Sequence, residues 1–431
     1  MHYSRTYCLI IFAFFYSYAR GQDTINSNTV EKRSYDLYMA KNWHALEEYG
    51  RVAIEHGIDY YYLRMRLGMA YYEGHNYLKA EDNFRKALTF NSGDANAMEY
   101  IYYCMIFTGR YEEARFYSKS FNEAVKEEVK VNTLPCIDAI TLESGVEISD
   151  SNKSFGNLYY AQLGLEHYIG NRLSLFHAFK YSTQVSYIVA LPNAKDSTAP
   201  KKNYSQLMEY EYYLKATIPF ANKWVVSPAV HWLGVESNDT SIHPPLPPPP
   251  HPPKGYRPIP GSKYDSTFFS NYWVASVSAE KRMSCFHLLF TLTLAHVDSN
   301  TSVQEQLSLD YSPFGNRNLI LGIGILPHTQ NGFSSNYMAV NPYLQIRPAK
   351  NLTISASYLA NQGFNVIQYD GYSVDNIHDL TTSVWSATAE YQFAPVFSFY
   401  ATYQLINEEN TNKNFTYNYT LLAAGIKILP K

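Results

Sequence analysis

The sequence has few cysteines and no long apolar run. Of its 4 cysteines, Cys104, Cys136 and Cys285 lie far apart and without a CxxC spacing, and Cys8 lies near the amino terminus. The pattern argues against a disulfide framework and against a zinc site, and indicates small buried side chains instead. No stretch reaches the ~20 apolar residues that a transmembrane helix needs. Mean hydropathy is −0.30, although 46% of the residues are hydrophobic.

An excess of basic charge is also missing, as are the common catalytic motifs. The formal net charge is −3 and the isoelectric point is about 6.5, so the chain has no basic field for nucleic acid. No GxSxG, HExxH or P-loop motif occurs in the sequence. We therefore expect a protein that is not an enzyme and that holds no cofactor and no metal.

Residues 1–21 have the build of a secretory signal peptide. Arg5 precedes an apolar stretch, and Ala19 and Gly21 supply small residues at positions −3 and −1 of a cleavage point before Gln22. The apolar stretch is too short for a membrane anchor, which needs ~20 residues. The sequence therefore predicts an exported protein.

Residues 27–125 repeat every 34 residues with a helical pattern. Trp43, Tyr77 and Tyr111 fall in register. The middle copy is the clearest, with Leu67, Gly68, Tyr71, Tyr77, Ala80, Phe84 and Ala87. This spacing resembles the tetratricopeptide repeat, strongly over 61–94, moderately over 95–125 and weakly over 27–60. We expect Gly68 to let paired helices approach closely and Phe84 to fill the space between pairs.

The resemblance to tetratricopeptide repeats implies a binding groove, because in this family the first helix of each pair lines a concave surface. The matching positions are Tyr35, Tyr38, Met39, Tyr62, Met65, Met69, Tyr72, Glu99, Tyr103 and Phe107. A groove rich in Tyr and Met suits an extended peptide, or a glycan against aromatic rings. The alternative is that some of these side chains only pack against a neighbouring helix or the rim of the following domain.

Strand patterns with a period of two recur from Ile140 to Ile428. Trp385, Ala387, Ala389, Tyr391 and Phe393, for example, alternate with Ser386, Thr388, Glu390 and Gln392. Alternation over about ten residues is typical of outer-membrane β-barrels, whereas strands of soluble sandwiches are usually ~5–6 residues long. The 41 tyrosines fit the aromatic girdles of such barrels.

The alternation predicts about fourteen antiparallel strands, with twelve as the alternative. They lie near 140–148, 157–168, 172–189, 204–218, 224–236, 265–280, 284–297, 302–311, 318–326, 336–347, 352–361, 381–393, 397–407 and 416–428. Short turns alternate with longer polar connections, which we expect outside the cell, at 190–203, 237–264, 327–335, 362–380 and 408–415. Residues 237–264 include a proline run that predicts polyproline II. The chain ends in Lys431 rather than in the aromatic residue common in such barrels.

Polar positions of the predicted strands are expected to face the lumen. They include Glu143, Glu166, Glu209, Glu211, Lys215, Arg347 and Glu390. The first interpretation is that they solvate a water-filled or plugged interior, and the second is a specific substrate site.

The predicted fold class is α plus all-β: a signal peptide (1–21), a periplasmic tetratricopeptide-repeat domain (22–135) and an antiparallel transmembrane β-barrel (136–431). This order resembles the YaiO-type outer-membrane proteins and is similar to the exopolysaccharide export porins. The resemblance implies a Gram-negative outer-membrane protein in contact with lipid. Its expected role is a pore or an export or assembly component, for instance for surface polysaccharide or protein, with the repeats docking a periplasmic protein or glycan. The alternative is a plugged barrel that anchors a scaffold.

Overall fold

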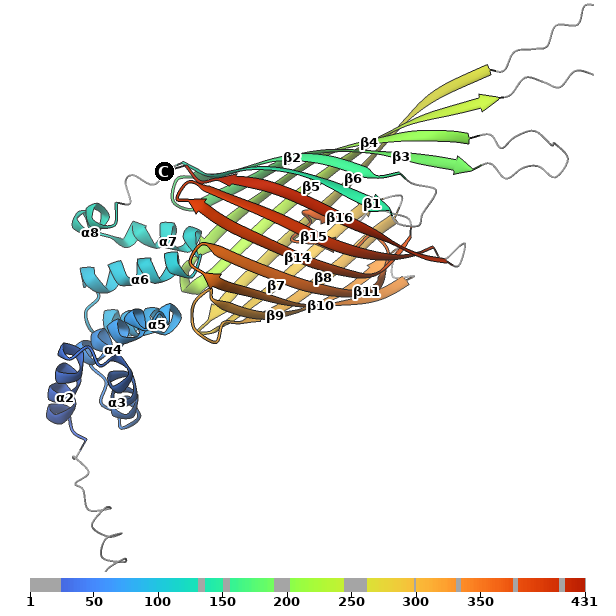
Figure 1. The fold of residues 1–431 in the computed structure, drawn as a ribbon. Coiled ribbons are helices and arrows are strands. Elements are labelled where there is room, and N and C mark those ends of the chain that lie inside the picture. The colour runs from blue at the N-terminus through green and yellow to red at the C-terminus, as the bar shows by residue number, and fades with distance from the viewer. Residues whose placement is uncertain are drawn as a thin grey trace, which may run out of the picture. The chain divides into compact units, whose positions relative to one another are not determined.

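The computed structural model describes residues 25–130, 136–149, 156–189, 202–243, 262–297, 300–330, 335–374, 379–410 and 415–430. The predicted signal peptide and the proline run lie outside these residues. Two compact units are present (Figure 1): the first contains 25–109 with Phe121–Val129, and the second contains Arg110–Ser120 with the strands. In the described part of the chain, no helix is both long and apolar enough to cross a bilayer.

The helices recur with the spacing expected from the sequence. Their bounds are α2 Ser27–Met39, α3 Trp43–Glu55, α4 Tyr61–Glu73, α5 Tyr77–Phe90, α6 Ala95–Phe107, α7 Tyr111–Tyr117, the 3-10 turn η1 Ser118–Ser120 and α8 Glu123–Glu128. Helices α2, α4 and α6 begin 34 residues apart, as do α3, α5 and α7. The helical period is therefore confirmed, while membership of the tetratricopeptide-repeat family stays a prediction.

The turn that joins the two helices of each pair contains a residue with a left-handed backbone conformation. Lys41, His75 and Gly109 occupy this repeat position with φ of 52°, 59° and 78°. In the first two pairs the next residue is an Asn that caps the second helix, and Asn42 accepts a hydrogen bond from the Ala45 backbone N–H at 3.3 Å. Only the third copy uses glycine, the residue that adopts this conformation without strain.

The core of the helical unit contains large apolar side chains. Leu46, Leu63 and Phe84 are fully buried. A Cβ atom built on Gly68 of α4 would lie 2.5 Å from Cε1 of Phe84 on α5, so the Phe84 ring packs directly on Gly68 and occupies the space that a side chain there would need. This confirms the close approach that the sequence predicted at Gly68.

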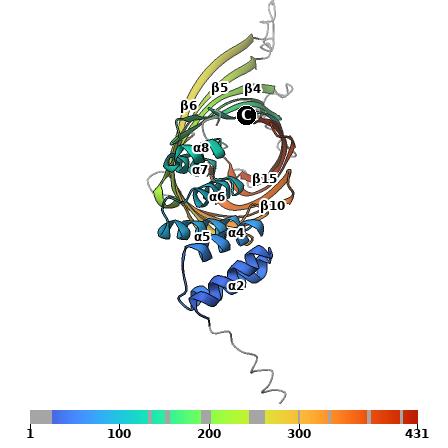
Figure 2. The same cartoon turned by 90° about the vertical axis from the view of Figure 1, so that its left-hand side faces the viewer.

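The second unit contains a closed antiparallel barrel of fourteen strands, in which β1 pairs with β16. The wall strands are β1 Ile137–Ser149, β2 Leu158–Ile169, β3 Leu173–Val189, β4 Lys202–Phe220, β5 Trp224–His243, β6 Ser262–Met283, β7 Phe286–Val297, β8 Asn300–Tyr311, β9 Leu319–Gln330, β10 Ser335–Ala349, β11 Leu352–Gly363, β14 Leu380–Ala394, β15 Phe397–Asn410 and β16 Phe415–Ile428. Figure 2 shows the ring that these strands form. The predicted strand number is confirmed.

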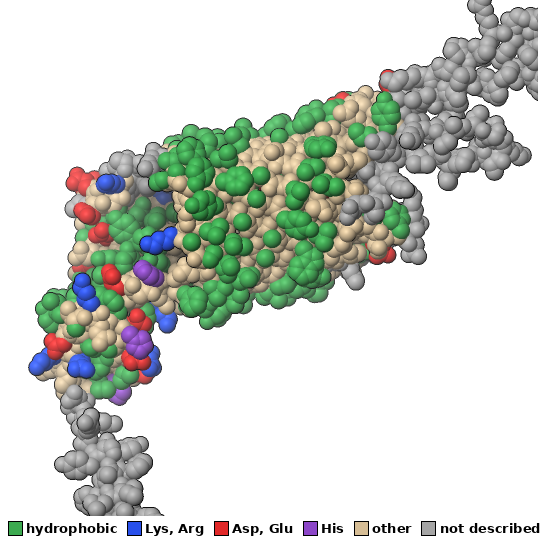
Figure 3. Space-filling view, viewed as in Figure 1, with side chains coloured by type: hydrophobic (Ala, Val, Ile, Leu, Met, Phe, Trp, Pro, Cys, Tyr) green, Lys and Arg blue, Asp and Glu red, His purple; other side chains and the backbone are tan. Residues whose placement is uncertain are grey.

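The outer side of the barrel is apolar. On β14, Trp385, Tyr391 and Phe393 are about half exposed, and the polar Ser386 and Thr388 between them line a cavity of the lumen. Apolar side chains are spread over the barrel wall in Figure 3. A closed barrel leaves no unpaired strand edge along its wall, and an apolar exterior suits hydrocarbon, so this geometry is that of a membrane-spanning barrel.

Two adjacent strands are longer than the sequence indicated. The predicted loop 237–264 is wrong at both ends, because β5 continues to His243 and β6 begins at Ser262. In this extension Asn238 pairs with Thr267, and the Thr267 hydroxyl donates to Asn238 Oδ1 at 2.6 Å. Polar residues occur here on both faces of the strands, so the apolar alternation that marks a lipid-facing strand is missing.

The connection between β11 and β14 also differs from the prediction. It was expected as an external loop over 362–380, but the described part folds into a hairpin inside the lumen, formed by β12 Ile367–Gln368 and β13 Ser373–Val374. Val366 and Ile367 are almost fully buried against the wall. Burial of these apolar side chains stabilises the inward position of the hairpin.

Candidate functional site

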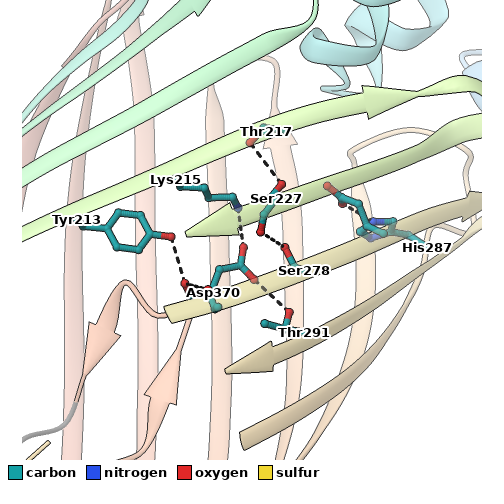
Figure 4. A network of polar contacts seen from close by, with 10 residues as sticks. Tyr213, Lys215, Thr217, Ser227, Ser278, His287, Thr291 and Asp370 are labelled. Atoms are coloured by element: carbon teal, nitrogen blue, oxygen red, sulfur yellow. Dashed lines mark hydrogen bonds and ion pairs between the residues drawn. The ribbon is translucent and has the colours of Figure 1, made fainter. Parts of the chain in front are cut away.

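The tip of the hairpin is fixed to the inner wall through Asp370 (Figure 4). Its Oδ2 lies 2.6 Å from Nζ of Lys215 on β4, and its Oδ1 accepts a hydrogen bond from the Thr291 hydroxyl on β7 at 3.1 Å. Its backbone carbonyl accepts hydrogen bonds from the hydroxyls of Ser276 at 2.6 Å and Tyr213 at 3.3 Å. One residue of the hairpin thus links three wall strands.

A second group of contacts joins the tip to an ion pair on the wall. Nδ1 of His231 on β5 lies 2.8 Å from the Gly371 carbonyl oxygen, and its Nε2 lies 3.0 Å from Oε2 of Glu211. Glu211 in turn forms a 2.7 Å ion pair with Lys180 on β3. His231 therefore connects the hairpin with the Lys180–Glu211 pair.

Glutamine side chains satisfy polar groups at the base and sides of the hairpin. Gln304 donates to the carbonyl of Ile367 and accepts from its backbone N–H, the latter at 3.2 Å. Gln330 donates to the Phe364 carbonyl at 2.8 Å, and Gln162 donates to the Tyr372 hydroxyl. A short hairpin in a lumen has few backbone hydrogen-bond partners of its own. Side chains of the wall therefore supply the hydrogen bonds that its buried backbone groups require.

The backbone at the tip is strained. Tyr369, Asp370 and Gly371 have φ of 54°, 58° and 88°, and only the last is a glycine. A bulky residue in the left-handed region is uncommon and persists where its surroundings hold it. The contacts of Asp370 provide that hold, and the side chain of Tyr369 remains 57% exposed although the hairpin lies within the barrel. The tip thus presents an aromatic ring to the lumen.

The larger cavity of the lumen, here called the outer cavity, has a volume of about 930 Å³ and a strongly acidic lining. Among the described residues, its carboxylates are Glu143, Glu147, Glu209, Glu211, Asp379 and Glu408, and Lys180 is the one basic residue. Charges of one sign in a cleft with low-dielectric walls focus the electric field and raise the local concentration of counter-ions. The outer cavity therefore attracts cations.

Several of these carboxylates are held by neutral hydrogen-bond donors. The hydroxyls of Tyr160 and Tyr400 donate to the two oxygens of Glu143 at 2.8 and 2.7 Å. The Thr381 hydroxyl donates to Oε1 of Glu408 at 3.1 Å. Hydroxyl donors stabilise a carboxylate without neutralising its charge, so these contacts leave the cavity negative.

A smaller cavity of about 350 Å³, here called the inner cavity, lies on the other side of the hairpin. Gln368, Tyr369 and Tyr372 line both cavities, which makes the hairpin the partition between them. On β4, Lys215 of the inner cavity lies nearer to the short turn after Phe220 than does Glu209 of the outer cavity. The two cavities therefore follow one another along the barrel.

The structure places the predicted lumen residues as follows. Glu143, Glu209 and Glu211 line the outer cavity, and Lys215 lines the inner one. Glu166 lies on the same face of β2 as Gln162, which lines the outer cavity. Glu390 on β14 pairs with Tyr400 on β15. Arg347, near the end of β10, donates a hydrogen bond to the backbone carbonyl of Lys350. A binding role for any of them stays a prediction.

The predicted groove residues of the helical unit fall into different environments. Tyr62 is 60% exposed and Tyr35 is 48% exposed, and both rings lie within 6 Å of the Arg66 guanidinium, at 5.8 and 5.3 Å. Tyr72 instead packs edge-on against Tyr100, with ring centroids 4.9 Å apart. The half-buried members are Tyr38, Met65, Met69, Glu99 and Tyr103. Binding by this set stays a prediction, and Tyr72 also serves packing between helices.

Sequence reasoning missed the hairpin residues Tyr369 and Asp370. A local signal was present, because Asp370-Gly371 is a typical turn pair and lies between the apolar Ile367 and Val374. Asn341 on β10 lines the inner cavity together with residues of the hairpin. Within the described ranges, no group of three or more His, Cys, Asp or Glu is arranged to hold a metal ion.

No family model and no curated protein matches the chain. Among solved structures, the toluene transporter TodX of P. putida is similar with a TM-score of 0.46 and 8% identity, covering 73% of this chain and 94% of that one. A FadL homologue of Pseudomonas aeruginosa has a TM-score of 0.39 and 11% identity, covering 68% and 90%. The translocator domain of the autotransporter NalP from Neisseria meningitidis has a TM-score of 0.33 and 8% identity, covering 75% and 99%. The YaiO-type and tetratricopeptide-repeat resemblances stay predictions.

Proposed function

We propose that this protein is a non-enzymatic outer-membrane channel for small solutes, with a preference for cations over anions. The observation that carries the proposal is the outer cavity of about 930 Å³, whose described lining contains six carboxylates and one lysine. Inside a low-dielectric wall, such a lining lowers the electrostatic energy of a cation and raises that of an anion. The closed barrel with an apolar exterior supports the membrane location.

The hairpin favours small solutes over a polymer. It separates cavities of about 930 and 350 Å³, so a polysaccharide or protein chain would pass only if the hairpin left the lumen. A small solute needs only a path past the side chains of Gln368, Tyr369 and Tyr372. The export of surface polysaccharide or protein, implied by the family resemblance, is therefore the less favoured role.

A plugged barrel that serves as a membrane anchor is the second candidate. It is favoured by the fixation of the hairpin, in which Asp370 alone contacts Lys215, Thr291, Ser276 and Tyr213. Under this alternative the helical unit would be the functional part. Electrical conductance separates the two candidates, because a plugged barrel carries no current.

We further propose that the helical unit lies in the periplasm and docks a periplasmic protein or glycan. The support is topological: the short turns, such as Ala221–Lys223, mark one end of the barrel and the longer connections mark the other. In single-chain bacterial barrels the short turns face the periplasm. An epitope inserted beside Pro249 is then expected to be labelled on intact cells.

Charge variants in a planar bilayer test the channel. Replacing Glu147 and Glu209 with Gln keeps side-chain size and removes two of the six carboxylates of the outer cavity. The cation-over-anion permeability ratio should fall in the double variant while the current remains. Glu48→Gln, an exposed position on α3, is the matched control and should leave the ratio unchanged. An equal ratio in all three proteins would remove the outer cavity from the conduction path.

A further inference from the structure

The inner cavity has the size and lining of a small-molecule site. Its volume of about 350 Å³ falls in the range of ~300–1,000 Å³ that is typical of ligand pockets. Most of its lining is aromatic or aliphatic: Phe176, Tyr213, Tyr369, Tyr372, Leu289 and Leu326. This lining contrasts with the acidic outer cavity and indicates a ligand with an apolar body.

Three of these rings form a fixed aromatic wall. Tyr213 and Tyr372 meet edge to face with ring centroids 5.0 Å apart and an interplanar angle of 71°. Phe176 lies against both, at 5.8 Å from Tyr372 and 6.1 Å from Tyr213. Rings that hold one another in place leave their remaining surface ready for a further ring at low entropic cost.

The fourth ring, that of Tyr369, is open to the lumen. More than half of its side chain is exposed, at 57%, and its backbone has a φ of 54° that a tyrosine adopts only under constraint. Strained residues cluster at ligand sites, where the strain positions a side chain. An exposed ring inside a partly apolar cavity is suited to stacking with an aromatic ligand.

One polar group of the inner cavity is left without a hydrogen bond. The side-chain oxygen Oδ1 of Asn341 is buried and has no partner among the described residues. The charged groups of the cavity, Lys215 and Asp370, are already engaged with each other at 2.6 Å. A buried amide oxygen normally accepts a hydrogen bond, so the missing donor is one that a ligand would supply.

We propose that the inner cavity binds a small aromatic molecule that carries a hydrogen-bond donor, of the class of the phenols. The ring packs between Tyr369 and the wall of Phe176, Tyr213 and Tyr372, and the donor reaches Oδ1 of Asn341. The proposal rests on the proposed function, since it names one class of solute for the same lumen. It adds a subsite that selects molecules with an aromatic ring and a hydrogen-bond donor.

The test compares phenol with anisole, its methyl ether, which has the same ring but no donor. Saturable binding to the full-length protein in detergent is measured by equilibrium dialysis, with free ligand determined in the aqueous phase and with protein-free micelles subtracted. Phenol is expected to bind about tenfold more tightly than anisole, the factor that one hydrogen bond to a buried acceptor provides. Absence of saturable binding of both probes overturns the proposal, and equal affinities overturn the role of the donor.

Two variants locate the site. Asn341→Leu is close in size and removes the acceptor, so phenol affinity should fall to that of anisole while anisole affinity stays constant. Tyr369→Gly removes the ring and relieves the left-handed backbone, so both affinities should fall. Neither change is expected to prevent folding, and a shifted band of unboiled protein on a detergent gel verifies the folded barrel. Unchanged affinities in both folded variants contradict the assignment.

Failure of this test and failure of the channel test can be told apart. A barrel that conducts cations but binds neither probe loses the subsite and keeps the proposed function. A barrel that binds phenol through Asn341 but carries no current keeps the subsite and loses the channel.

Discussion

Backbone strain at single residues lowers the stability of the helical unit. Lys41 has a φ of 52° at the repeat position where Gly109 occurs in the third copy. Side chains with a Cβ atom are strained in the left-handed region by about 1–2 kcal/mol, and glycine is not. Replacing Lys41 with glycine would relieve this strain. Part of the gain in stability is offset because glycine is also freer in the unfolded chain.

Lys41→Gly is therefore expected to raise the free energy of unfolding by about 0.5–1 kcal/mol. Thermal unfolding followed through the helical circular-dichroism signal measures the change. Lys32→Gly is the matched control, because Lys32 is exposed in the interior of α2 and glycine there costs about 1 kcal/mol. The same sign of effect for both variants would contradict the argument.

The carboxyl group of Glu112 on α7 is expected to make stability depend on pH. Burial raises the pKa of Glu112 to about 7, and the carboxylates Glu166 and Asp138 of the barrel oppose its ionisation. A carboxyl group whose pKa is raised by folding stabilises the folded state fully below its unfolded pKa. That contribution is lost as pH rises through the folded pKa.

Glu112→Gln should consequently raise the unfolding temperature at pH 8 relative to the parent protein and have little effect at pH 4. The measurement is the unfolding temperature of the detergent-solubilised protein at both values. Glu123→Gln, on the exposed start of α8, provides the control for a general loss of negative charge. A parent-to-variant difference that is the same at pH 4 and pH 8 would refute the role of Glu112.

At the scale of elements, the ion pair of Asp370 is one of the contacts that hold the inserted hairpin, and a single substitution can weaken that hold. Asp370→Asn removes the ion pair with Lys215, which is 2.6 Å long and only partly exposed. Loss of a charged hydrogen bond of this kind costs about 1–3 kcal/mol and leaves Lys215 without its counter-ion. The hairpin should therefore leave the wall more often.

The expected result of Asp370→Asn is a larger mean conductance or added current steps of single channels in a planar bilayer. Asp239→Asn, on the outer part of β5, is the control and should behave as the parent protein. Identical current records for Asp370→Asn and the parent would show that the hairpin does not limit the current.

Substitutions in the helical unit should affect stability differently at core positions and at surface positions. Phe84→Ala removes a fully buried ring and should lower the free energy of unfolding by about 3–5 kcal/mol. Tyr62→Ser changes a side chain that is 60% exposed, so stability should change by about 0.5 kcal/mol or less, while capture of the proposed periplasmic partner should weaken. Thermal unfolding and pull-down with immobilised full-length protein measure the two effects. Unfolding of the Tyr62→Ser protein would place Tyr62 in the core.

At the scale of the whole molecule, the strands and the helical period could be predicted because each follows a pattern that repeats along the sequence. Each barrel strand has one side toward lipid and one toward the lumen, so Trp385 and Phe393 alternate with polar residues and reveal the strand. The extension of β5 and β6 lacked this signal, because neither face there is consistently apolar. The 34-residue helical period was also visible, because the same packing constraint recurs in each helical pair.

The candidate site was less predictable because it depends on contacts across the barrel. Alternation placed Glu209, Glu211 and Lys215 among the polar positions of β4, but it could not show that a hairpin divides the lumen. Strands β12 and β13 have two residues each, which is too short for a period to appear. Asn341 and Tyr369 line the same inner cavity although they lie on different elements of the chain.

The most direct test of the central claim is the zero-current potential of the purified protein in a planar bilayer with a tenfold KCl gradient. A cation-preferring channel lets K⁺ move down the gradient ahead of Cl⁻, so the dilute side should become electrically positive. A conducting barrel with a negative dilute side would contradict the role of the acidic outer cavity. A protein that inserts and carries no current would contradict the channel itself.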